Sequence, residues 1–87
     1  MIFVHGQGRI VNGPYIDGSS DGNVTIEHGK GKEVQLLASN YLSVQGLLPL
    51  KKGDSISFEG MIDDLDEVYS SIRISKITKL EIRKRYK

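Results

Sequence analysis

The chain has 87 residues, a formal net charge of +1, two histidines and no cysteine. This length provides for one hydrophobic core and no second domain. The lack of cysteine excludes disulfides, thiolate chemistry and the usual Cys/His zinc sites, and it suits a reducing compartment.

Residues 2–11 predict a long first strand, because two sets of side chains alternate along it. The set expected to face inward is Val4, Gly6, Gly8 and Ile10. The set expected to face outward is Phe3, His5, Gln7, Arg9 and Val11. Two inward glycines suit a strand that coils around a small barrel. Asn12-Gly13-Pro14 predicts the end of this strand, and residues 17–22 predict a turn.

Residues 23–28 and 33–39 predict the next two strands, joined by a tight hairpin at the glycine-rich segment 29–32. Their inward positions are Val24, Ile26, Val34, Leu36 and Ala38. Their outward positions are Thr25, Glu27, Glu33, Gln35 and Leu37, none of them aromatic. These outward positions therefore give no base-stacking ring on this part of the sheet.

Ser39 or Asn40 is expected to cap a helix of one or two turns that begins near Tyr41. A fourth strand is predicted over residues 54–62, followed by an acidic loop over 63–67. The last strand is predicted from Val68 to about Leu80. Its apolar spacing lengthens after Ile74, which indicates a bulge or a turn at the end of the strand. Inward side chains on these two strands are Ile56, Phe58, Gly60, Ile62, Ile72 and Ile74.

Three strands, a short helix and two further strands follow the element order of the OB fold. The run Gly53-Asp54-x-Ile56-x-Phe58-x-Gly60 with the apolar residues of 72–80 resembles the last two strands of bacterial single-stranded-DNA-binding proteins and the primosomal protein N group. Gly8-Arg9-Ile10 is similar to the Gly-x-Val sequence in the first strand of this family. The predicted fold class is all-β: a five-stranded OB-type Greek-key barrel with one short helix between strands 3 and 4. An SH3-like or Sm-like barrel is the alternative.

The predicted domain covers residues 1–81, and residues 82–87 form a basic C-terminal tail. From Arg73 onward there are seven basic residues and one acidic residue, whereas the residues before Arg73 include five basic and ten acidic ones. Such asymmetry is typical of polyanion binding and also of a solvated tail. The resemblance implies binding of single-stranded DNA or RNA in replication or recombination.

The candidate nucleic-acid-binding residues combine aromatic rings, which stack on bases, with cations that contact phosphates. Phe3, His5 and Arg9 share the outer face of the first strand, and Lys30 and Lys32 lie in the hairpin. The other candidates are Tyr69 and Arg73 on the last strand and Arg83, Lys84, Arg85 and Tyr86 in the tail. The alternative roles are a second apolar cluster around Phe3, a solubilising hairpin and a disordered terminus.

A second hypothesis is a protein-interaction module, either a subunit or an inhibitor, that uses the barrel face and the acidic loop. A third is a homodimer whose joined edge strands form a groove for nucleic acid. No nucleophile motif, paired catalytic carboxylates or metal site is recognisable, so neither an enzyme nor a cofactor is expected. The apolar N-terminus lacks a basic region, and no apolar run reaches the roughly 18 residues that span a bilayer. A cytoplasmic protein without membrane contact is therefore expected.

Overall fold

The structure is a computed structural model that describes residues 2–62 and 71–80. These residues are mostly strand and include one short helix. The elements are β1 (Ile2–Asp17), β2 (Asp21–Gly29), β3 (Lys32–Ala38), α1 (Tyr41–Leu47), β4 (Ser55–Ile62) and β5 (Ser71–Lys79). The predicted all-β class and the order of strands and helix are confirmed. The predicted tail 82–87 lies outside the described residues.

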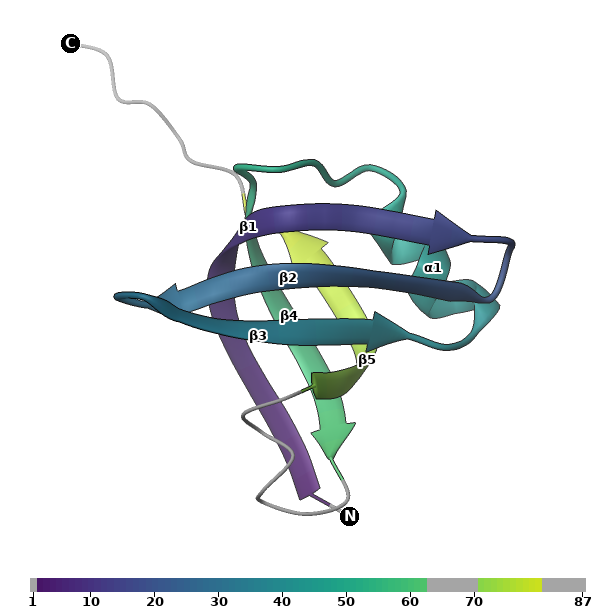
Figure 1. Cartoon of the computed structure of the whole chain (residues 1–87). Coiled ribbons are helices and arrows are strands. Elements are labelled where there is room, and N and C mark those ends of the chain that lie inside the picture. Colours follow the sequence, from purple (N-terminus) through teal and green to yellow (C-terminus); the bar gives the residue numbers. More distant parts are fainter. Residues whose placement is uncertain (1, 63–70, 81–87) are drawn as a thin grey trace, which may run out of the picture.

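The five strands form one sheet that closes in a ring (Figure 1). The order around the ring is β1-β2-β3-β5-β4, and β4 pairs with β1 again. Every neighbouring pair is antiparallel except β3 and β5, which run parallel. β1 takes part in two pairings: its first half lies against β4, and its second half lies against β2.

β1 is longer than the sequence predicts, and the expected strand end at Asn12-Gly13-Pro14 is wrong. These residues form irregularities within β1, where the register with β2 shifts twice between Ile10 and Tyr15. Gly13 has a φ of 90°, a conformation that glycine adopts readily. Pairing with β2 then resumes from Tyr15 to Asp17. The break is therefore a bulged bend, and Tyr15 lies in a strand and not in a loop.

The inward side chains predicted from alternation form the core. All of the aliphatic and aromatic residues predicted to face inward on β2 to β5 are buried, as is Ile10. Val4 is partly buried and packs against this core. On β4, Gly60 allows β5 to approach closely, because a Cβ there would lie 2.5 Å from the carbonyl oxygen of Arg73. Burial of these side chains supplies the main driving force for closing the ring.

α1 closes one end of the ring (Figure 1). Asn40 caps it as predicted, because its Oδ1 accepts a hydrogen bond of 2.9 Å from the backbone N–H of Ser43. The buried Ser43 hydroxyl donates to the carbonyl of Ile74, which ties the helix to β5. Leu47 packs close to Gly22 at the start of β2. No helix of residues 2–62 and 71–80 is long and apolar enough to cross a bilayer.

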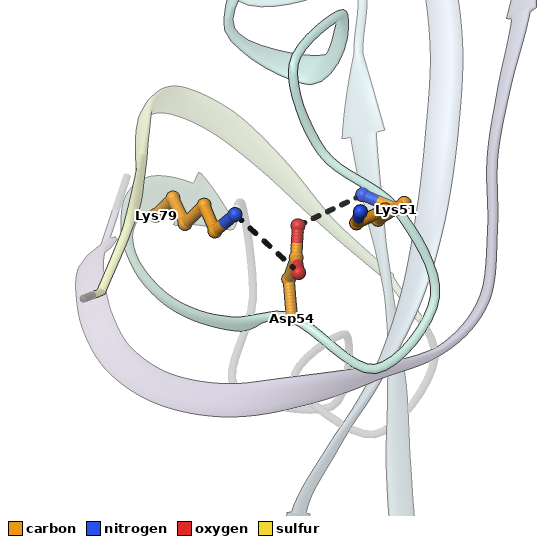
Figure 2. Close-up of polar contacts among 3 residues, drawn as sticks. All are labelled: Lys51, Asp54 and Lys79. Atoms are coloured by element: carbon orange, nitrogen blue, oxygen red, sulfur yellow. Dashed lines mark hydrogen bonds and ion pairs between the residues drawn. The ribbon is translucent and has the colours of Figure 1, made fainter. Parts of the chain in front are cut away.

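The turn before β4 is held by the carboxylate of Asp54 (Figure 2). Its Oδ2 accepts a 3.0 Å hydrogen bond from the backbone N–H of Lys51, and its Oδ1 lies 3.7 Å from the ammonium of Lys79. Gly53, with a φ of 97°, and Asp54 also exchange backbone hydrogen bonds of 2.9 Å with Ile10. The Gly-Asp pair therefore aligns β4 against β1.

β5 contains a bulge, which is one of the two alternatives that its apolar spacing predicts. Glu59 of β4 faces Lys76, whereas the next residue, Gly60, faces Ile74, so Ser75 is the extra residue. The Ser75 hydroxyl donates to the carbonyl of Glu59 at 3.2 Å. This bulge explains why the apolar spacing of β5 changes after Ile74.

Candidate functional site

A row of outward-facing side chains crosses all five strands of the ring. Each member faces the next in the pairing register, so neighbouring members are about 5 Å apart along the sheet. In order around the ring, the members are Tyr15 (β1), Asn23 (β2), Leu37 (β3), Arg73 (β5), Met61 (β4) and Phe3 (β1). We call this set the outer row. It brings aromatic, apolar and cationic groups onto one continuous path.

The two aromatic members of the outer row are well exposed. The exposed fraction is 57% for Tyr15 and 77% for Phe3. Tyr15 is oriented locally, because its hydroxyl donates a 2.7 Å hydrogen bond to Oδ1 of Asn12. Since Phe3 is so exposed, the alternative that it covers a second apolar cluster has no support in this structure. Both rings therefore offer a free surface for stacking.

One end of the outer row lies in a shallow surface hollow of about 400 Å³. Tyr15, Asn23 and Leu37 line this hollow together, from three neighbouring strands. Leu37 is half-buried and adds apolar surface to the hollow, which Asp17 and Asp21 also line. An exposed ring that shares a hollow with an apolar side chain offers a surface on which a planar group can pack.

Phe3 and Arg73 are close in the register, since only Met61 of β4 separates them. Arg73 is exposed and also takes part in an interaction within the protein. Its expected neighbour Tyr69 lies outside the described residues, as do Arg83, Lys84, Arg85 and Tyr86. The structure thus brings together Phe3 and Arg73 among the predicted candidates.

Arg9 differs from the expectation of a cation available to phosphate. Its guanidinium lies 3.7 Å from the carboxylate of Glu27, which it faces across the β1–β2 pairing. Glu27 in turn faces Glu33 on β3, so two acidic groups share this part of the sheet. The positive charge of Arg9 is therefore offset locally, although its side chain is 62% exposed.

Lys30 and Lys32 lie exposed at the β2–β3 hairpin, as predicted. The hairpin extends from the end of the ring opposite α1 (Figure 1). His5 is exposed on β1, and it lines a cavity at this end together with His28 of β2. The predicted site residues therefore divide between the outer row and the hairpin end.

The candidate site residues predicted from the sequence do not include Tyr15, Leu37 or His28. The sequence places Tyr15 near a predicted loop, where a tyrosine can stack on a base but more commonly lies at the rim of the core, and only the continuation of β1 beyond the bend places it in the outer row. His28 was missed because its proximity to His5 depends on the closure of the ring. Within the described ranges 2–62 and 71–80, no cluster of three or more histidine or acidic side chains is placed to hold a metal ion. No family model matches the chain, and no curated protein matches its sequence.

Proposed function

We propose that the chain is an OB-type barrel that binds single-stranded nucleic acid, in replication or recombination, along the outer row. The strand order β1-β2-β3-β5-β4, the parallel pair β3–β5 and a helix between β3 and β4 all support the OB assignment. OB domains commonly bind oligonucleotides on the face that β2 and β3 form. The start of the outer row lies on this face.

The observation that carries the proposal is the spacing of exposed rings and apolar groups along the outer row. Tyr15 and Phe3 are exposed at its two ends, and Leu37 lies between them. Every base has a flat π-face, so stacking on such groups binds a strand without selecting its sequence. In duplex DNA these faces are already stacked on one another, so the proposal predicts a preference for single strands.

The cations at the hairpin supply the second part of binding. Lys30 and Lys32 are exposed and can contact phosphates as flexible point charges. Arg73 adds a positive group within the outer row itself. The acidic pair Glu27 and Glu33 lies between the hairpin and the row, so phosphates are expected to pass beside this pair and not over it.

Fluorescence anisotropy with labelled single-stranded DNA, duplex DNA and RNA across a salt series tests this function. Micromolar or tighter binding of single strands, weakening as salt rises, is the expected result. Tighter binding of the duplex than of the single strand would overturn the proposal. Repeating the titration without residues 82–87 measures what the basic tail adds.

A second candidate function is docking onto a protein partner, because α1 exposes large apolar side chains. The exposed fractions are 58% for Tyr41, 80% for Leu42 and 56% for Leu48, which directly follows the helix. Exposed apolar clusters of this kind are common at protein interfaces. Flat anisotropy traces for all three probes at low salt would favour this function. Light scattering during size exclusion would show whether the partner is a second copy of the chain.

A further inference from the structure

A cavity of about 230 Å³ lies at the end of the ring opposite α1. Its inner wall is apolar and comes from four strands: Val4, Val34, Phe58 and Ile72. Its rim carries two polar rings, His5 and His28. The cavity is smaller than the roughly 300 Å³ at which pockets for drug-sized ligands begin, so it suits a single ring system.

The path of β1 creates this cavity. β1 and β2 stay paired as far as Arg9 and Glu27, and the first half of β1 pairs only with β4. On the other side, β3 pairs with β5 only from Gln35 onward. The beginnings of β1 and β3 therefore have no pairing with each other among the described residues, and the cavity is lined by residues of both segments.

Gly6 leaves space in the cavity because it has no side chain. Gly6 lies against the ring of Phe58, and a Cβ at this position would be 3.3 Å from two atoms of that ring. Any side chain on Gly6 would therefore press on Phe58 or occupy the cavity. The absence of a side chain here leaves room for a ligand against the apolar wall.

The two rim histidines can recognise a polar edge. In the part of the chain that the structure describes, neither imidazole takes part in a hydrogen bond or ion pair. A neutral imidazole offers one N–H donor and one nitrogen acceptor. A ligand ring with flat apolar faces could pack on the apolar wall of the cavity. Hydrogen-bond donors and acceptors on the edge of that ring could then pair with the two imidazoles at the rim.

The positive charge near the cavity indicates which class of ring-containing ligand would bind there. The hairpin continues directly from His28 to Lys30 and Lys32, both exposed. A ligand whose ring enters the cavity and whose anionic group reaches the hairpin would satisfy the wall, the rim and the lysines together. A nucleotide has this combination of a flat polar-edged ring and a phosphate.

We propose that this cavity binds one nucleobase of the bound strand, with its phosphate held by the β2–β3 hairpin. This inference rests on the proposed function. It adds a specific site for one base of the bound strand, which enters the cavity and does not stack on the outer row. Insertion of one base would fix the register and polarity of the strand, which stacking along the row alone does not do.

Titration of the ¹⁵N-labelled full chain with thymidine 5′-monophosphate, followed by NMR, tests the cavity directly. We expect saturable shifts of the backbone amides of Gly6, His28 and Val34. Ribose 5-phosphate, which has the phosphate but no base, is the matched probe and should shift only the amides around Lys30 and Lys32. Equal shifts of the cavity amides with both probes would overturn base binding, because the phosphate alone would then explain them.

Gly6→Ala narrows the cavity, because a Cβ there would lie 3.3 Å from the ring of Phe58. Leu42→Ala is its control, because Leu42 is 80% exposed on α1, at the other end of the ring. We expect Gly6→Ala to weaken nucleotide binding about fivefold or more, and Leu42→Ala to leave it unchanged. If Gly6→Ala does not fold, His28→Ala is the second variant, because His28 is exposed and its replacement removes one imidazole from the rim. We expect it to weaken nucleotide binding in the same assay. Unchanged binding in the folded variants would contradict the proposal.

Oligonucleotide binding, measured on the same samples, separates this inference from the proposed function. If single strands bind but the cavity amides do not shift and Gly6→Ala binds equally well, the cavity proposal is wrong and the proposed function stands. If the nucleotide enters the cavity but no single strand binds, the proposed function and the insertion of a strand base are both wrong, and the cavity is a site for a free mononucleotide. If neither ligand binds, both are wrong.

Discussion

The guanidinium of Arg9 lies 3.7 Å from the carboxylate of Glu27, and these residues form the outermost register pair between β1 and β2. Beyond this pair the two strands separate, and the cavity with the two histidines lies close by. The ion pair therefore lies where the pairing between β1 and β2 ends. It also offsets one of the cations expected to contact phosphate, so we predict that Glu27 weakens the proposed binding of single strands.

Glu27→Gln should strengthen binding of single-stranded DNA about two- to fivefold, because Arg9 is then available to phosphate. The salt dependence of binding should also steepen, since one more phosphate contact adds about 0.7 to the slope for a single strand. Glu33→Gln is the control: it removes the same charge on the neighbouring strand but leaves the Arg9–Glu27 pair intact. Equal gains for both variants in anisotropy would mean that Arg9 does not contribute a contact.

Tyr15→Ala should weaken single-strand binding by about 1 to 3 kcal/mol, the range for loss of one base–aromatic stack. Tyr15→Phe should bind nearly as well, because it keeps the ring and loses only the hydrogen bond to Asn12. Tyr41→Ala on α1 is a matched control, because its exposed fraction of 58% is close to the 57% of Tyr15. We expect Tyr15→Ala to weaken binding more than Tyr41→Ala in anisotropy. A larger loss of binding for Tyr41→Ala would place the contact on α1.

The double variant Lys30→Ala/Lys32→Ala should reduce the salt slope of single-strand binding by about 1.4, the value for two lost phosphate contacts. The control is Lys51→Ala/Lys52→Ala, which removes the same charge from exposed positions in the turn before β4. This control should leave the slope almost unchanged. The same loss of slope in both double variants would indicate a general effect of net charge and not a contact at the hairpin.

Asp54→Ala should lower the free energy of unfolding by about 1 to 2 kcal/mol, because the backbone N–H of Lys51 loses its acceptor. Asp54→Asn keeps an oxygen acceptor and should cost less. Lys79→Ala should cost about 0.5 kcal/mol or less, since the lysine side chain is 46% exposed and its ion pair is screened. Urea unfolding measures all three. A loss for Lys79→Ala as large as for Asp54→Ala would show that the ion pair, and not the hydrogen bond, holds the turn.

Much of the fold follows from local pattern in the sequence. The inward positions of β2 to β5 were predicted because alternation reports directly which face of a strand is buried. A helix cap at Ser39 or Asn40, and a bulge or turn late in the last strand, were predicted from local signals of the same kind, and the structure has the cap at Asn40 and a bulge at Ser75. These features depend on residues only a few positions apart, so the sequence alone carries them.

The parts that sequence reasoning missed depend on residues far apart in the chain. The bend at Gly13 looked like a strand end, but pairing of Tyr15 with Asn23 of β2 continues the strand beyond it. Arg9 looked available because its partner Glu27 is on another strand. In the sequence pattern Leu37 is one outward residue among several, and only the register with its neighbours shows that it belongs to the outer row.

NMR mapping of the full chain with an oligothymidylate tests the central claim most directly. We expect the amide signals of Tyr15, Leu37 and Phe3 to shift together at one saturating ratio, while those of Tyr41 and Leu42 on α1 stay in place. Shifts confined to α1, or no shift at an oligonucleotide concentration that saturates the anisotropy signal, would contradict binding along the outer row.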